Sequence, residues 1–230
     1  MKLPLIVSVP HSGLTVPEEV RDNCALTPQQ ILVDSDEGAA EIYNLKSEVV
    51  KYITTPVARA IVDVNRAEND RRRDGVIKTH TCYGIPIYRK PLSEETVEIL
   101  LDNYYRPYHR NISEYSHNAK LGVDCHTMAA VGPPTAPDTG CDRPGVCLSD
   151  ASGTCPKDWF DELVRCFAKS FDCEISVNSP FKGGHIIRSH CHELPWVQIE
   201  LSRAPFLDLA EKRRRVFNAL VLFCGITKKR

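Results

Sequence analysis

Short apolar runs alternate along this chain with longer stretches in which apolar residues recur at helical spacing. The apolar runs predict strands over residues 3–9, 49–54, 60–64, 122–125, 173–177 and 196–201. Several are almost continuously apolar, as are central strands that are covered on both faces. Amphipathic stretches predict helices over residues 36–46, 156–170 and 207–224. This alternation predicts an α/β fold with a mixed, mostly parallel sheet.

The clearest helix is predicted to begin near Ser93, because acidic residues fill its first turn and an apolar stripe continues to Tyr115. Pro107 is expected to kink it. Residues 128–154 are rich in Pro, Gly and Asp and too many for a simple connection, so they are predicted to form a functional loop or lid. Without repeats or low-complexity segments, residues 1–230 are expected to form one three-layer domain with its site at the strand ends.

The charge balance argues against a nucleic-acid or membrane partner. The chain has 29 Lys and Arg against 30 Asp and Glu. Its basic runs at residues 71–73, 212–215 and 228–230 are interpreted as solvated surface rather than as phosphate-binding patches. Residues 1–10 contain a short apolar run that lacks a cleavage site and cannot span a bilayer, so a cytoplasmic protein is expected.

Ten cysteines are scattered along the chain without a CxxC pair. Because no signal for export to an oxidising compartment accompanies them, they are expected to be buried thiols. A disulfide or a second metal site among Cys141, Cys147 and Cys155 stays an alternative, although their spacing is poor for either.

Two predicted strands each lead into a histidine. His11 follows the first strand in Val-Ser-Val-Pro-His-Ser-Gly, and His126 ends the run Val-Asp-Cys-His-Thr. Asp124, two residues before His126, is of the type that orients a metal-bound imidazole. His11 alone is more typical of an ordinary loop histidine than of a ligand, but two histidines at strand ends favour a metal site.

Acidic residues can complete such a site. Asp34, Asp36 and Glu37 lie where a helix is predicted to begin, so they either cap that helix or provide one metal ligand. Two histidines and one carboxylate match the three protein ligands of a catalytic zinc. Glu200 lies inside the predicted strand Trp-Val-Gln-Ile-Glu-Leu, where an unpaired carboxylate would be costly, so it is predicted to be a general base beside the metal.

Arginines and an asparagine supply groups that can bind a carboxylate. Arg59 precedes the predicted strand 60–64, and Asn65 and Arg66 follow it, so they can offer a guanidinium fork and an amide donor. Arg188 follows a Gly-Gly turn whose backbone can approach a ligand closely. A surface salt bridge and a plain hairpin turn are the simpler alternatives.

These segments resemble the N-formylglutamate amidohydrolase family, in order, from residue 7 to about residue 203. The matching segments are Pro-His-Ser-Gly at 10–13, Asp-x-Asp at 34–36, Asp-x-Asn-Arg at 63–66, Pro-Tyr-His at 107–109, Asp-x-His at 124–126, Gly-Gly-x-Ile-x-Arg at 183–188 and Gln-x-Glu at 198–200. No single motif is specific, but their shared order is. The pattern is also similar to that of the wider zinc carboxypeptidase and aspartoacylase group.

The resemblance implies a zinc site and a base. His11, Asp36 and His126 would bind Zn²⁺, and Glu200 would be the catalytic base. Glu37 stays an alternative to Asp36, because the related carboxypeptidases use a glutamate ligand.

The resemblance also implies roles in substrate binding. Asn65 and Arg66 would hold a substrate carboxylate, and Arg59 would polarise the scissile carbonyl. His109 would join the site through its Pro-Tyr-His motif, and Arg188 would add a further anion-binding group.

The implied activity is hydrolysis of a small acidic N-acyl amino acid, foremost N-formyl-L-glutamate to formate and L-glutamate. Thr127, His185 and the segment 189–192 depart from the family pattern, and because that segment is expected to line the pocket, the substrate stays open. One alternative is a carboxypeptidase-like or other deacylase that acts on a different N-acyl amino acid or peptide. Another is a metal- and carboxylate-binding protein without turnover, which the buried Glu200 disfavours.

Overall fold

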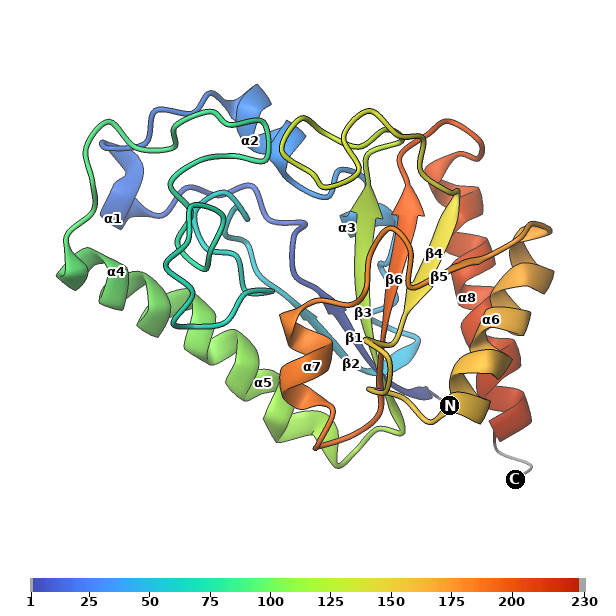
Figure 1. Ribbon diagram of the computed structural model, residues 1–230. Coiled ribbons are helices and arrows are strands. Elements are labelled where there is room, and N and C mark those ends of the chain that lie inside the picture. The colour runs from blue at the N-terminus through green and yellow to red at the C-terminus, as the bar shows by residue number, and fades with distance from the viewer. Residues whose placement is uncertain (1, 228–230) are drawn as a thin grey trace.

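A six-stranded sheet runs through the centre of the molecule (Figure 1). Its strands are β1 (Leu3–Val9), β2 (Val49–Thr54), β3 (Leu121–Met128), β4 (Val146–Ser149), β5 (Ser176–Val177) and β6 (Trp196–Ser202), in the spatial order β2-β1-β3-β6-β4-β5. Every pairing is parallel except that of β4 with β6. The predicted mixed, mostly parallel sheet is therefore confirmed. This computed structural model describes residues 2–227, so the basic run at residues 228–230 lies outside the described residues.

Helices cover both faces of the sheet, which gives the three layers (Figure 1). On one face lie α3 (Ala39–Ile42), α6 (Lys157–Phe171) and α8 (Leu209–Thr227), and on the other lie α5 (Arg106–Ser116) and α7 (His185–His190). The short helices α1 (Glu18–Arg21) and α2 (Pro28–Asp34), with α4 (Glu94–Leu100), extend away from the sheet. A π-helical turn, Leu101–Tyr105, joins α4 to α5 directly before Pro107, whose missing N–H disturbs regular α-helical bonding.

Alternation along the central strands separates an apolar face from a polar one. Val123 and Cys125 of β3, like Val197 and Ile199 of β6, belong to the core beneath α6 and α8. Residues between them face the opposite side, because successive side chains of a strand alternate. Parallel pairing then places Ser8 beside Asp124, Asp124 beside Gln198, and His126 beside Glu200. Five buried polar side chains thus come to one face at the carboxyl ends of three strands.

Several element predictions were wrong or incomplete. Residues 60–64 form a buried, turn-rich segment rather than a strand, with the N–H of Ile61 bonded to Ala58 and that of Asp63 to Val76. The predicted helix over 36–46 contains only the four-residue α3, and the strand predicted over 173–177 only the two-residue β5. The predicted loop 128–154 contains β4, and the predicted glycine turn leads into α7. Apolar runs predicted that residues 60–64 are buried, but they did not predict the backbone conformation.

No disulfide joins the ten cysteines, all of which lie among the described residues. Cys147 and Cys155 are buried and Cys141 is exposed, and these three do not form a metal-binding group within residues 2–227. The expectation of buried thiols holds for six of the ten, because Cys141, Cys173 and Cys191 are exposed and Cys82 is half-buried.

Candidate metal centre

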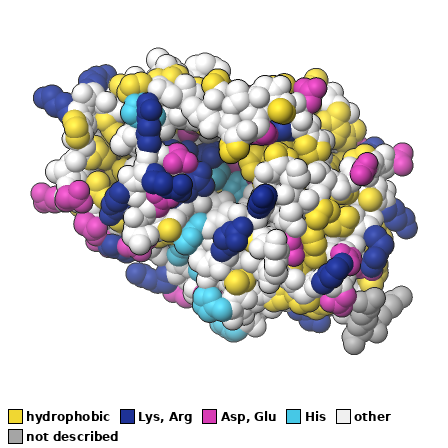
Figure 2. All heavy atoms as spheres, in the orientation of Figure 1, with side chains coloured by type: hydrophobic (Ala, Val, Ile, Leu, Met, Phe, Trp, Pro, Cys, Tyr) yellow, Lys and Arg dark blue, Asp and Glu magenta, His cyan; other side chains and the backbone are white. Residues whose placement is uncertain are grey.

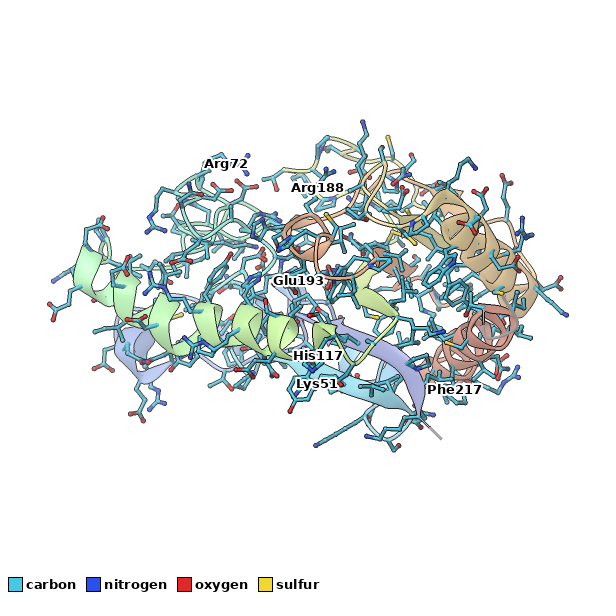
Figure 3. The ribbon with its side chains drawn as sticks, turned by 90° about the horizontal axis from the view of Figure 1, so that it is seen from below. Lys51, Arg72, His117, Arg188, Glu193 and Phe217 are labelled. Atoms are coloured by element: carbon cyan, nitrogen blue, oxygen red, sulfur yellow. The ribbon has the colours of Figure 1, made fainter. Side chains whose placement is uncertain are left out.

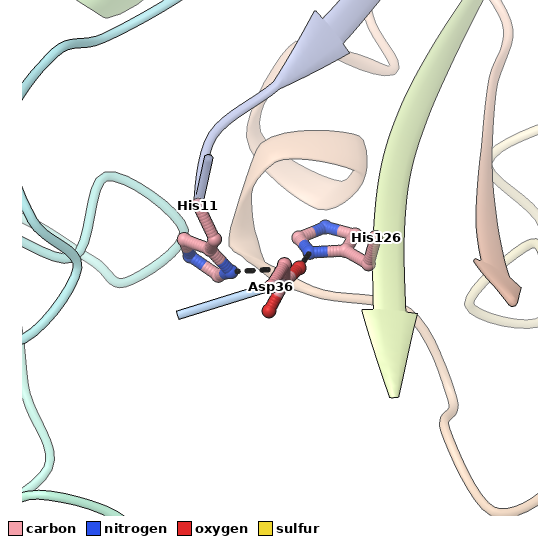
Figure 4. Close-up of side chains that lie close together, drawn as sticks. All are labelled: His11, Asp36 and His126. Carbon is pink, nitrogen blue, oxygen red and sulfur yellow. Dashed lines mark hydrogen bonds and ion pairs between the residues drawn. The ribbon is translucent and has the colours of Figure 1, made fainter. Parts of the chain in front are cut away.

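Three side chains from separate segments converge beyond the strand ends: His11, Asp36 and His126 (Figure 4). Nδ1 of His126 lies 2.9 Å from Oδ2 of Asp36, and Nδ1 of His11 lies 3.5 Å from the same oxygen. One donor atom from each residue lies within 4.8 Å of the others, and all three side chains are buried. The two imidazoles and the carboxylate therefore face a common point.

Local backbone structure brings these residues together. His11 lies two residues beyond β1, and its carbonyl accepts the backbone N–H of Asp36 at 3.0 Å. This bond ties the turn after α2 to the end of β1. His126 lies inside β3, and the Tyr43 hydroxyl donates to its carbonyl at 2.8 Å. The strand and the two turns thus fix all three side chains from different directions.

Two buried aspartates hold the histidine rings from behind. Nε2 of His11 lies 2.8 Å from Oδ1 of Asp63, and Nε2 of His126 lies 2.8 Å from Oδ2 of Asp124. A carboxylate at Nε2 accepts a hydrogen bond from the N–H of a neutral imidazole, which keeps the proton on Nε2 and leaves the Nδ1 lone pair free to bind a metal. Asp124 thus makes the contact expected from its place before His126, whereas Asp63 was not predicted to contact His11.

This arrangement fits a metal ion. Nδ1 of His11 is buried without a hydrogen-bond partner, which is costly for a polar atom that has no ligand. Two imidazole nitrogens and one carboxylate oxygen form a donor set that suits zinc and leaves a position open. Within residues 2–227, this is the one group of three or more His, Cys, Asp or Glu side chains able to hold a metal. Glu37 is not part of it, and its backbone carbonyl accepts from Thr127.

Electrostatic interactions between Asp36 and the two histidines shift the pKa values of the site. Burial by itself would raise the pKa of Asp36, but the charge and hydrogen bonds of His11 and His126 hold it well below its usual value. Burial opposes a charge on His126 too, yet Asp124 and the other nearby acids raise its pKa well above the usual range. The cluster is therefore suited to a cation, either protons or a metal ion.

Glu200 lies beside His126 on the neighbouring strand. Burial, the largest effect, raises the pKa of this carboxyl to about 7, with His126 opposing the rise and Asp36 adding to it. Gln198 donates from its Nε2 to Oε1 of Glu200 at 2.9 Å, and its own oxygen accepts the Gly184 N–H at 2.6 Å. Gln198 belongs to the Gln-x-Glu motif but was given no role from the sequence, although its place two residues before Glu200 assigns it to the same face of β6.

The loop after β2 brings further polar groups to the site. Arg59 donates to Oδ1 of Asp36 at 3.1 Å. The amide of Asn65 lies 3.2 Å from both Asp124 and His126, and its oxygen accepts the Ile186 N–H at 2.8 Å. Asn65 is thus fully engaged within the protein, while the Arg66 guanidinium is bonded only to backbone carbonyls and lies 3.9 Å from an Asp74 oxygen.

A buried lysine, which was not predicted to be part of the site, lies next to this loop. Nζ of Lys78 is 3.4 Å from Oδ2 of Asp63 and 3.6 Å from Oδ2 of Asp34, and all three side chains are at most 3% exposed. Lys78 therefore balances the charge of the aspartate that holds His11. No sequence pattern marks it, because the segment around it is irregular.

These residues open onto a cavity of about 630 Å³. Of the residues predicted from the sequence, it is lined by His11, Asp36, Arg59, Asn65, Arg66, His126 and Glu200. Arg188 lies outside it and bonds to the Lys182 and Gly183 carbonyls, and His109 lies behind Val64. Figure 2 shows histidine side chains within a hollow of this face and Lys and Arg side chains around its rim.

A sequence profile described as N-formylglutamate amidohydrolase matches residues 3–207. The chain belongs to the N-formylglutamate amidohydrolase family. A protein similar to this chain is the N-formylglutamate deformylase of Pseudomonas putida. The two are 24% identical over 231 residues, which cover 91% of this chain and 84% of that protein.

Solved structures support the fold of this N-formylglutamate amidohydrolase family member. N-formylglutamate amidohydrolase from Ralstonia eutropha JMP134 aligns with a TM-score of 0.77 and 20% identity, over 99% of this chain and 94% of that one. A gene product from Agrobacterium tumefaciens aligns with a TM-score of 0.77 and 15% identity, over 99% of this chain and 90% of that one. None of the helices within residues 2–227 combines the length and apolar character that crossing a bilayer requires.

Proposed function

We propose that this protein is a zinc-dependent amidohydrolase that cleaves a small acidic N-acyl amino acid, foremost N-formyl-L-glutamate, to formate and L-glutamate. The observation that carries the proposal is the convergence of His11, Asp36 and His126 beside the buried carboxyl of Glu200, in one cavity. Membership of an amidohydrolase family supports the same reaction class.

The chain supplies a distinct group for each part of amide hydrolysis. A zinc ion held by His11, Asp36 and His126 would lower the pKa of water and polarise the substrate carbonyl. Glu200 is suited to accept a proton from the attacking water and to return it to the leaving amine, because its pKa near 7 allows both steps at neutral pH. Gln198 holds that carboxylate in place through its amide.

Arg59 and Arg66 are the groups we assign to the substrate's oxygens. Arg59 is 22% exposed and borders the triad, so it can stabilise negative charge that develops on the carbonyl oxygen. Arg66 lines the same cavity and meets its nearest carboxylate, Asp74, only at 3.9 Å, which leaves its charge available for a substrate carboxylate. Asn65 acts indirectly, since its amide hydrogen-bonds protein groups.

The volume of the cavity favours a second candidate, a deacylase of a larger N-acyl amino acid or short peptide. About 630 Å³ lies in the middle of the range for ligand pockets and exceeds what a formyl group needs. Part of the wall is apolar, with Met128, Pro133, Pro137 and Phe181 among its lining residues. The chemistry of Glu200 and the metal ligands would be the same for either substrate.

The test is metal content measured together with formate release from N-formyl-L-glutamate. We expect about one zinc per chain in the purified protein, and both metal and activity lost in His126→Ala. His192→Ala is the matched control, because this histidine side chain is 73% exposed and pairs with Glu193 rather than with a residue of the triad. Zinc without formate release would redirect the substrate to other N-acyl amino acids, and protein without zinc would refute the proposal.

A further inference from the structure

A chain of hydrogen bonds runs through two histidines outside the cavity. Nδ1 of His190 lies 3.1 Å from Oε2 of Glu193, and its Nε2 lies 2.9 Å from Nδ1 of His109. Nε2 of His109 in turn lies 2.9 Å from the carbonyl of Val64. The two rings stack with 5.2 Å between their centroids. In Figure 3 Glu193 lies between α7 and α5, consistent with the bond that it accepts from Ser113 at 2.7 Å.

The Val64 carbonyl fixes the direction of these bonds. A carbonyl only accepts, so Nε2 of His109 carries the proton. Burial, aided by the charge of His190, lowers the pKa of His109 to about 3, so this ring is neutral and its Nδ1 is an acceptor. Nε2 of His190 therefore donates to it, and Nδ1 of His190 shares with the Glu193 carboxyl the further proton that their own contact needs. His190 thus stabilises the tautomer of His109 that bonds to Val64.

The segment held in this way carries the residues that approach the substrate. Val64 directly precedes Asn65 and Arg66. Tyr105 donates its hydroxyl proton to the Arg66 carbonyl at 2.9 Å and accepts from Nε2 of His185 at 3.2 Å. The carbonyls on both sides of Asn65 are therefore anchored by His109 of α5 and by Tyr105 of the π-helical turn before it.

We propose that His109 and His190 are positioning residues that hold the Val64 carbonyl and thereby set the place of Arg66 in the substrate cavity. This inference rests on the proposed function for its kinetic consequence, but not for the tautomer. It replaces the expected direct contact of His109 with substrate, because His109 does not line the cavity. The other ionisable groups that act on the pair are His185, His192, Glu193 and Asp124.

A pair of substitutions at one position separates positioning from general packing. His190→Leu removes the donor to His109, whereas His190→Gln can supply an N–H at a similar reach. We expect the leucine variant to raise KM for N-formyl-L-glutamate about tenfold with a smaller change in kcat, and the glutamine variant to recover most of that loss. His117→Ala, which changes an exposed histidine bonded to Asn118, should match the wild type. Equal KM values for the leucine variant and the wild type would refute the proposal.

Nitrogen NMR of the histidines tests the tautomer without turnover. In the wild-type protein, His109 should have a protonated Nε2 and an Nδ1 that accepts a hydrogen bond, and this signature should be lost in His190→Leu and kept in His190→Gln. A His109 protonated at Nδ1 would overturn the inference even if the enzyme is active. If formate is not released at all, the proposed substrate fails while the tautomer result still decides this inference.

Discussion

At the scale of single residues, the buried environment of Glu200 in the folded protein determines the pKa of its carboxyl. It lies in a strand whose alternate residues form the core, so it is 5% exposed and its pKa rises to about 7. Gln198 provides one directed hydrogen bond, and His126 beside it keeps the ionised form accessible. A buried carboxylate with a pKa near the working pH is suited to proton transfer rather than to structure alone.

Replacing this carboxyl by an amide of the same shape separates chemistry from binding. We expect Glu200→Gln to lower kcat for N-formyl-L-glutamate by about a thousandfold, because an amide cannot accept the proton from water. Zinc content should stay at the wild-type level, since Glu200 is not in the metal-binding group. Glu174→Gln, an exposed change of the same kind, serves as the control. Activity within tenfold of wild type would remove Glu200 from the role of base.

Residue types at strand ends predicted the metal triad, whereas the residues that contact the triad could not be predicted as well from the sequence. His11 follows an apolar run, His126 ends one, and Asp36 belongs to a short acidic segment. These positions allow all three to be recognised as candidate ligands in the sequence. Asp63 and Lys78 lie in irregular backbone, where no period relates position to direction. Their roles depend on the folding of residues 55–80 over the site, which no local pattern encodes.

At the scale of elements, a close contact between β3 and β6 supports the polar face. Gly122 pairs with Trp196, and a Cβ added at Gly122 would lie 2.2 Å from the indole ring. Trp196 is fully buried, so its ring cannot move away without disturbing the core beneath α7. The absence of a side chain at Gly122 therefore allows this ring to cover the strand.

This contact makes Gly122→Ala a specific test of the β3–β6 packing. We expect it to lower the free energy of unfolding by about 1–3 kcal/mol, because overpacking a close-fitting core costs that much. Gly225→Ala is the matched control: it lies in α8 with nothing within 4 Å of an added Cβ, and should stabilise by about 0.5–1 kcal/mol. Denaturant unfolding of both variants gives the comparison. A neutral effect at Gly122 would show that the indole ring is free to shift.

Elements with a regular period were predicted well, and those fixed by tertiary contacts were not. The strands β1, β2 and β6 and the helices α6 and α8 match the sequence patterns within a few residues. Residues 60–64 are as apolar as a strand, but they turn at Ala58 and remain buried without ladder partners. The four-residue β4 was missed, because nearby Pro, Gly and Asp residues hide a segment that only its pairing with β6 makes a strand.

At the scale of the whole molecule, buried histidines on the side of α5 and α7 connect stability to pH. Burial lowers the pKa of His109 to about 3, and it also lowers the pKa of His185 and His190. In the unfolded chain such histidines take up protons near pH 6.5. Below that pH the unfolded state binds more protons than the folded state, so acid favours unfolding. Above it His109 is neutral in both states, and its contribution to the stability is complete.

The contribution of His109 to the free energy of unfolding should therefore fall as the pH is lowered from 6.5 towards 3. His109 alone contributes a loss on the order of 3 kcal/mol by pH 4, from about 1.4 kcal/mol per pH unit over the interval in which only the unfolded chain is protonated. Denaturant unfolding between pH 7 and pH 4 should show about 3 kcal/mol less loss of stability on acidification for His109→Gln than for the wild type. The control His117→Ala, which alters an exposed histidine bonded to Asn118, should follow the wild type. Equal slopes for His109→Gln and the wild type would mean that His109 takes up its proton in the folded protein as readily as in the unfolded chain, and would exclude the neutral ring on which the bond to Val64 depends.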